Sequence, residues 1–307
     1  MEEFRFKEVG RQLSNWGRWG PDDQRGTVNL ITPERRAAAG ALITRGEVID
    51  LGIAFDAEGP HSGGVRFNPI HRMTLLPSQD VQAAGLAIAD DLVIMPLQCA
   101  TQWDGLAHIG YDGALYNGVS VDTVTAQSGA LHNGIEHVAT ELVGRGVLLD
   151  VARHRGVQRL SPSERITADE LQAVAEQQRV EVRPGDILLV RTGWQLHFVD
   201  GDIELFMSAQ DPGLDLSCCA WLRERDVAAV ASDNVTVEVR PSPELPARLP
   251  LHMVLIRDMG MTLGEMFDLE ALARDCDAVG SWEFFFSGVG LKVTGGVGSP
   301  LSPIVIR

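Results

Sequence analysis

The sequence predicts an α+β fold. Many short segments have the apolar or alternating pattern of strands, and only a few carry helix signals. The two kinds of segment do not alternate at the regular spacing of βαβ units, which argues against a doubly wound sheet. The chain has 307 residues, of which 45% are hydrophobic and 22% are charged, so it can bury a large core.

The first 31 residues are predicted to form an arm. They include Trp16 and Trp19 in a turn-rich stretch of Asn, Gly, Pro and Asp residues, so two large aromatic side chains need to be buried. The arm either packs on its own domain or covers a pocket, its own or a neighbour's. Both alternatives fit the residues equally well.

The first helix has a clear start. Thr32 is a helix cap, Pro33 suits the first turn, and Glu34 favours the positive end of the helix dipole. The helix is expected to run to about Thr44, before Gly46. We therefore divide the chain into residues 1–45, the arm and first helix, and residues 46–307, a single domain.

Other elements follow from periodicity and caps. Residues 48–54 alternate as a strand does, and Thr167 and Glu170 form a capping box for a helix that ends near Gln178. Helices are also expected over 215–224 and, capped by Asp268, over 269–274, and the last forty residues resemble paired strands. Short apolar runs predict buried strands over 92–95, 146–151 and 187–191, and a further strand is expected over 227–231.

Charge and cysteine content limit the partners. The formal net charge of −16 repels phosphate backbones, so nucleic acid is not expected. No apolar run reaches the roughly 18 to 20 residues that a membrane helix needs. The charged N-terminus lacks the apolar core of a signal peptide, and the four cysteines lack Cys-x-x-Cys spacing. These features predict a cytoplasmic protein with free thiols and no membrane partner.

The stretch from residue 98 to 108 concentrates polar chemistry. If the chain is helical after Thr101, then Asp104 and His108 stand four apart and share one helix face. A carboxylate beside an imidazole suits a metal site or a general acid/base pair. The alternative is a polar helix start, in which Thr101 is the cap and His108 a surface residue.

This stretch resembles the signature of the cyclase family of metal-dependent hydrolases, which includes bacterial kynurenine formamidases. The signature is His-x-Gly-Thr-His-x-Asp-x-x-x-His, and Thr101, Asp104 and His108 match its Thr, Asp and last His. Gln98 and Gln102 stand where the family has its first two His, which indicates a subgroup. Further similar segments are 144–150, 184–194, 252–269 and 291–303.

The resemblance implies a fold and an assembly. The fold is the family's mixed β-barrel-like core with helices packed outside, and the assembly is a homodimer or higher homo-oligomer. The tryptophan-bearing arm offers apolar surface for such a contact.

The resemblance also implies a site. The family's metal ligands correspond to Gln98, Gln102, Asp104, His252 and Glu265. A metal lowers the pKa of bound water and polarises a carbonyl group, and the family's proton-transfer residue corresponds to His108. Amide oxygens in place of two imidazoles favour manganese, magnesium or calcium over zinc. Alternatively, the two glutamines hydrogen-bond in a metal-free pocket.

Four further residues are candidates for a substrate pocket. Trp103 lies within the signature, and His71 follows an Asn-Pro pair that resembles a pocket segment of the subgroup. Tyr111 and Tyr116 belong to a turn-rich loop, where hydroxyl-bearing rings suit either ligand contact or loop packing.

Two functions remain open at this point. The first is a hydrolase that opens the amide or lactone bond of a small molecule with manganese, magnesium or zinc. The second is a metal-free small-molecule binding protein, or a non-hydrolytic enzyme, on the same fold. The two glutamines favour the second, and the joint presence of Asp104, His108, His252 and Glu265 favours the first.

Overall fold

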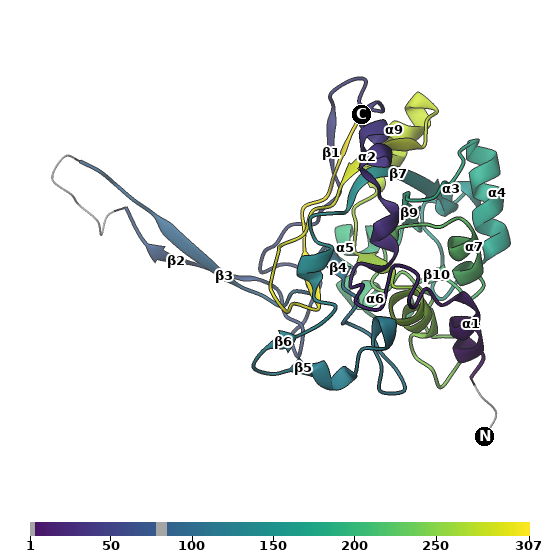
Figure 1. The fold of residues 1–307 in the computed structure, drawn as a ribbon. Coiled ribbons are helices and arrows are strands. Elements are labelled where there is room, and N and C mark those ends of the chain that lie inside the picture. The colour runs from purple at the N-terminus through teal and green to yellow at the C-terminus, as the bar shows by residue number, and fades with distance from the viewer. Residues whose placement is uncertain (1–3, 78–84) are drawn as a thin grey trace.

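The structure is a computed structural model that describes residues 4–77 and 85–307. Its largest sheet has nine strands among these residues, and the sheet curls into a half-barrel with helices outside (Figure 1). The predicted α+β fold with a barrel-like mixed core is confirmed. In spatial order the strands are β1 (Val48–Asp50), β15 (Ile304–Ile306), β13 (Glu283–Ser287), β7 (Val143–Asp150), β9 (Ile187–Arg191), β11 (Ala229–Ser232), β12 (Thr262–Glu265), β4 (Gln102–Asp104) and β14 (Gly298–Pro300).

The centre of this sheet is parallel. Strands β7, β9, β11 and β12 run in the same direction, whereas the strands flanking them pair antiparallel. Helices α3 (Val151–His154) and α4 (Ala168–Gln178) lie between β7 and β9 in the chain, and α7 (Cys218–Glu224) lies between β9 and β11. The chain therefore contains βαβ connections that the irregular spacing of its sequence segments did not indicate.

Alternating side chains of the central strands fill two cores. Val147 and Leu188 belong to the apolar cluster under α4 and α7, whereas Leu148 and Leu189 belong to the cluster that includes α9 (Glu270–Val279). Because successive strand residues point to opposite faces, both faces of the parallel strands are buried.

Two helix starts confirm the predicted caps. The Thr32 hydroxyl accepts a hydrogen bond from the Arg35 amide at the start of α2 (Pro33–Gly40), and the Thr167 hydroxyl accepts one from Glu170 at the start of α4. Helix α4 ends at Gln178, as predicted, whereas α2 ends before the predicted Thr44.

The N-terminal arm packs on its own domain. It contains α1 (Arg5–Leu13) and η1 (Gly26–Leu30), and its residues 1–3 lie outside the described part. The Trp16 indole donates to the Arg257 carbonyl at 2.7 Å, and Arg18 pairs with Asp226 at 2.7 Å. These contacts favour the first of the two alternatives for the arm.

A two-stranded hairpin stands apart from the body. Strands β2 (Ile70–Leu75) and β3 (Asp90–Ile94) pair antiparallel and project away from the half-barrel (Figure 1). Every residue of β3 is exposed. The prediction of a strand over residues 92–95 is correct in kind, but the prediction that it is buried is wrong, because β3 pairs only with β2 among the described strands.

The remaining elements are short. Within residues 4–77 and 85–307, no helix combines the length and apolarity needed to cross a membrane. The other elements are η2 (Tyr116–Gly118), η3 (Val121–Thr123), β5 (Val124–Thr125), β6 (Gly129–Ala130), η4 (Ile135–His137), β8 (Arg165–Ile166), α5 (Leu196–Val199), α6 (Ile203–Phe206), β10 (Gly213–Leu214), α8 (Pro250–His252) and the π-helical turn η5 (Met253–Asp258).

Candidate active site

The signature stretch forms a strand at the point where the sequence analysis considered a helix. In β4, Gln102 stands directly opposite Glu265 of the neighbouring β12. Because side chains alternate along a strand, Gln102 and Asp104 share one face and Trp103 points to the other. The helical interpretation of residues 101–108 is therefore wrong, although strand alternation still brings the predicted side chains together.

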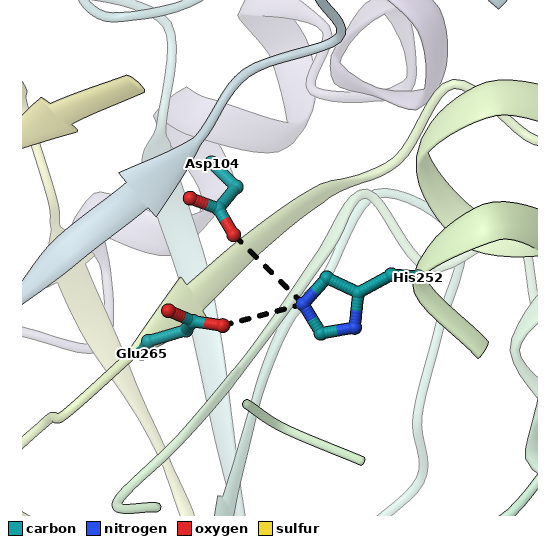
Figure 2. Close-up of side chains that lie close together, drawn as sticks. All are labelled: Asp104, His252 and Glu265. Atoms are coloured by element: carbon teal, nitrogen blue, oxygen red, sulfur yellow. Dashed lines mark hydrogen bonds and ion pairs between the residues drawn. The ribbon is translucent and has the colours of Figure 1, made fainter. Parts of the chain in front are cut away.

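Three predicted ligands converge from separate elements. Figure 2 shows Asp104 of β4, Glu265 of β12 and His252, the last residue of α8, turned toward one another. The His252 Nε2 atom lies 3.2 Å from Glu265 Oε1 and 3.9 Å from Asp104 Oδ2. One ligand atom of each residue lies within 4.8 Å of the others, and all three side chains are buried. This spacing suits a single cation.

The two glutamines differ in their placement. Gln102 Nε2 donates to Glu265 Oε2 at 2.7 Å and lies 3.4 Å from Asp104 Oδ1, so this amide belongs to the cluster. Gln98 lies against Gly298 of β14, and its buried Nε2 atom has no hydrogen-bond partner in the described chain. The described contacts thus join Gln102 to the carboxylates and do not join Gln98 to them.

Burial and the proximity of several charged groups shift the pKa values of the cluster. Burial, followed by the proximity of Glu265, raises the pKa of Asp104 to about 6. Burial opposes charging of His252, but its contacts with Glu238 and Glu265 outweigh that effect and raise its pKa to about 10. The carboxylates thus favour the protonated imidazole, and Arg66 Nη1, 4.0 Å from Glu265 Oε2, adds a second positive charge near the cluster.

Two orphaned acceptors test whether a cation fits. Asp104 Oδ2 and Gln102 Oε1 are buried, and neither has a hydrogen-bond partner among the described residues. A buried acceptor without a partner is costly, and a cation within the carboxylate cluster would satisfy Asp104 Oδ2. Gln102 turns its Nε2 atom toward the carboxylates, so its Oε1 atom would join such an ion only after the amide rotates. Carboxylate and amide oxygens with a single imidazole form a donor set that suits hard divalent ions. The residues present fit a divalent metal.

Glu238, which was not among the predicted site residues, contacts His252 on the side away from the other carboxylates. Its Oε1 atom accepts from His252 Nδ1 at 2.5 Å and from the His252 amide at 3.0 Å, while Oε2 accepts from the Leu251 amide at 3.2 Å. Glu238 is itself buried. In the sequence, Glu238 stands at a polar position of the alternating segment Val-Thr-Val-Glu-Val over residues 235–239, where an exposed side chain is the ordinary expectation. Its contact fixes the imidazole so that Nε2 faces the other carboxylates.

His108 lies at the edge of the cluster. Its Nε2 atom is 3.8 Å from Asp104 Oδ1, and its side chain keeps 20% of its surface exposed. Together with His252 and Glu265 it lines a cavity of about 570 Å³. An imidazole between a buried carboxylate and an open cavity is placed to exchange protons with a bound molecule.

Two predicted pocket residues lie elsewhere. His71 is exposed on the hairpin and pairs with Asp91 at 2.7 Å. The Trp103 indole donates to the Gly288 carbonyl at 2.7 Å and packs in the core against Phe267. Neither lines the cavity in the part of the chain that the structure describes. The physical reasons are strand alternation for Trp103 and the projecting hairpin for His71.

The two tyrosines hold other parts of the chain together. The Tyr111 hydroxyl donates to Asp258 Oδ2 at 2.8 Å beside η5, and the Tyr116 hydroxyl donates to Asp23 Oδ2 of the arm at 2.9 Å. Neither is among the described residues that line the cavity. These contacts favour the packing alternative for both rings, since each hydroxyl has a carboxylate acceptor within the chain.

A buried group of carboxylates and imidazole at the end of a cavity is the constellation of an enzyme active site. The model of the cyclase family matches residues 49–239, more than half of the chain, so the chain belongs to the cyclase family of enzymes. The resemblance stated from the signature is thereby confirmed at the level of the family. The assignment to a subgroup with glutamine in place of histidine remains a prediction.

Solved structures agree with this assignment. One described as a novel cyclase is 38% identical, covers 97% of this chain and 99% of its own, and has a TM-score of 0.90. Isatin hydrolase A from Ralstonia solanacearum is 24% identical, with 89% and 97% covered and a TM-score of 0.61. A predicted metal-dependent hydrolase from Bacillus stearothermophilus is 14% identical, with 84% and 97% covered and a TM-score of 0.52. The last two show the fold alone. No protein with a curated description matches the sequence.

Proposed function

We propose that this enzyme is a metal-dependent hydrolase that opens an amide or lactone bond of a small molecule. The observation that carries the proposal is the convergence of Asp104, His252 and Glu265 beside an open cavity. The proposed reaction class is also that named for two proteins of the same fold, one described as an isatin hydrolase and one as a predicted metal-dependent hydrolase.

The residues have separable roles in this proposal. Asp104, His252 and Glu265, with the Gln102 amide beside them, would hold a manganese, magnesium or zinc ion. Such an ion supplies a Lewis acid that lowers the pKa of bound water and polarises a carbonyl. His108 takes a proton from the attacking water and returns it to the leaving nitrogen or oxygen. Glu238 accepts a hydrogen bond from His252 Nδ1, which holds the proton on that nitrogen and leaves Nε2 facing the site.

One observation favours the alternative, a metal-free binding protein or non-hydrolytic enzyme. Gln102 already donates to Glu265 at 2.7 Å, and His252 contacts both carboxylates, so hydrogen bonds hold much of the cluster together. The orphaned Asp104 Oδ2 and Gln102 Oε1 atoms argue against this alternative, because hydrogen bonds within the described chain leave both unsatisfied.

Metal analysis separates the two functions. Protein purified without chelator should carry divalent metal, measured by mass spectrometry, and should hydrolyse members of a panel of amides and lactones. Chelation should abolish hydrolysis, and addition of manganese, magnesium or zinc should restore it. A protein that binds none of these ions in a direct titration would refute the metal half of the proposal, and hydrolysis that persists after chelation would refute the mechanism.

The cysteines and the exposed apolar residues bear on the compartment and the assembly. We propose a homodimer or higher homo-oligomer in the cytoplasm. The four cysteines are free and buried, as suits a reducing compartment. The apolar hairpin offers more exposed surface for self-association than the arm that the sequence suggested.

A further inference from the structure

The cavity beside the active site carries more positive than negative side chains. Arg66, Arg240 and Arg248 line it, and Glu265 is the one carboxylate among its described lining residues. The chain as a whole has a formal net charge of −16, so its general field repels anions. The arginines therefore form a local exception, and a bound group of opposite charge would explain it.

The three arginines differ in how their charge is used. The Arg240 guanidinium is bound to the buried Asp211 at 2.5 Å, which neutralises it. Arg66 Nη1 lies 4.0 Å from Glu265 Oε2, too far for a hydrogen bond. Arg248 forms no ion pair or hydrogen bond within residues 4–77 and 85–307. Two guanidinium groups on the cavity wall thus have donors available for a ligand.

A neighbouring histidine adds a second, independent observation. The His61 Nε2 atom is buried in the cavity wall and has no hydrogen-bond partner among the described residues. Burial, and then the charge of Arg66, lower the pKa of His61, so the imidazole is neutral at pH 7. A buried polar atom without a partner is costly unless a ligand satisfies it. His61 and Arg66 together therefore form one polar side of the cavity, with hydrogen-bonding groups that a ligand could satisfy.

The other part of the cavity is apolar. Met207, Val235 and Leu249 line it, and the volume of about 570 Å³ is within the usual range for small-molecule sites. A molecule that satisfies both walls has a hydrocarbon body and a charged end. A neutral hydrocarbon would leave the arginine and histidine donors unpaired, and a small inorganic anion would leave the apolar wall in contact with water.

We propose that the substrate is an organic anion, whose carboxylate or equivalent group is bound by Arg66 and Arg248 while its apolar body contacts Met207, Val235 and Leu249. This inference rests on the proposed hydrolase function, since the same molecule must also carry the amide or lactone bond. The anionic group holds the molecule at one end, and the scissile carbonyl then faces His108 and the Asp104–His252–Glu265 group.

Equilibrium binding tests the inference without requiring turnover. The probes are 2-naphthylacetate and its neutral counterpart 2-(2-naphthyl)ethanol, measured by calorimetry on the protein as purified. Wild type should bind the anion on the order of tenfold more tightly, as one or two charge-assisted hydrogen bonds imply. Arg66→Gln and Arg248→Gln should each weaken binding of the anionic probe severalfold and leave the affinity for the neutral probe unchanged. Arg274→Gln, an exposed arginine of α9 outside the cavity lining, is the matched control and should change neither.

Three outcomes would overturn the inference. They are equal affinity for the two probes, no binding of either probe, and an anion preference that survives the double variant Arg66→Gln/Arg248→Gln. The last outcome would mean that a metal or another group binds the carboxylate. High salt gives an internal check, because screening of charge should weaken binding of the anionic probe and leave binding of the neutral probe unchanged.

Hydrolysis of a matched ester pair separates this inference from the proposed function. Phenyl acetate is neutral and 4-acetoxybenzoate is anionic, and kcat/KM for both is measured in the same variants. Hydrolysis of both esters without preference for the anionic one would refute the proposed anionic substrate and leave the proposed hydrolase function intact. Anion binding that depends on the two arginines, with no hydrolysis of esters, amides or lactones, refutes the hydrolase and leaves the anion site.

Discussion

The central sheet and the projecting hairpin are built from similar sequence but have opposite surroundings. Residues 187–190 of β9 and residues 92–94 of β3 are both apolar runs, yet every residue of β9 is buried and every residue of β3 is exposed. Strand β9 has a parallel neighbour on each side and core clusters on both faces. An apolar run thus identifies a strand, while its neighbours determine whether it is buried.

The same difference determines which polar residues can do chemistry. Asp104 and Glu265 stand on adjacent strands of the body, and Glu238 fixes the imidazole of His252. His71 stands on the hairpin, where one exposed aspartate contacts its ring. Precise positioning needs surrounding structure, so chemistry is expected in the body and not on the hairpin.

The largest expected effect compares the two histidines. His108→Asn should lower turnover by about 10² to 10⁴, the usual contribution of a general acid or base, with little change in unfolding free energy. His71→Asn on the hairpin is the matched control and should leave turnover unchanged. Steady-state kinetics on the best substrate of the hydrolysis panel gives both values. Equal turnover for wild type and His108→Asn would show that this imidazole transfers no proton in the rate-limiting step.

The second comparison concerns stability. Leu148 of β7 is fully buried, so Leu148→Ala should destabilise the fold by about 2 to 5 kcal/mol through lost contacts and a residual cavity. Leu92→Ala removes the same atoms from the exposed β3 and should change stability by less than about 0.5 kcal/mol. Urea unfolding followed by fluorescence measures both. Both values refer to a protein concentration at which light scattering shows a monomer, and a large loss for Leu92→Ala under that condition would contradict the exposed position of β3.

A third test asks whether the support behind His252 matters. Glu238→Gln keeps the shape of the side chain but removes its charge, and should weaken divalent-metal affinity by about 10- to 100-fold. Competition with a metallochromic chelator gives the affinity, and circular dichroism shows whether the variant is folded. Asp91→Asn, which removes the carboxylate beside His71, should leave metal affinity unchanged. Wild-type affinity in Glu238→Gln would reduce Glu238 to a structural role.

Substitutions on the hairpin are expected to have the smallest effect on the stability of the monomer. Their effect is therefore measured on self-association. A lone two-stranded hairpin is at best marginally stable in water, so its apolar residues are expected to contact a second copy of the chain. The double variant Leu92→Ser/Ile94→Ser should shift the protein toward monomer in light scattering while its unfolding curve moves little. A wild-type monomer at working concentration would contradict the predicted homo-oligomer.

Local signals in the sequence determined two helix starts and one buried strand. The caps at Thr32 and Thr167 and the bounds of β9 were predictable because side chain and backbone interact within a few residues. The family signature identified Asp104 and His108, and its downstream partners His252 and Glu265. These are the parts of the site that a pattern of residues can specify without knowledge of the fold.

Tertiary structure decided the rest. Strand β4 takes its conformation from pairing with β12 and β14, so a segment with helical spacing became a strand. Trp103 faces the core for the same reason, and the hydroxyls of Tyr111 and Tyr116 donate to Asp258 and Asp23 instead of lining the cavity. Glu238 and the cavity arginines lie outside the segments in which the sequence analysis found a resemblance to the family. Their roles arise from which distant segments the fold places side by side, and a linear pattern does not contain that information.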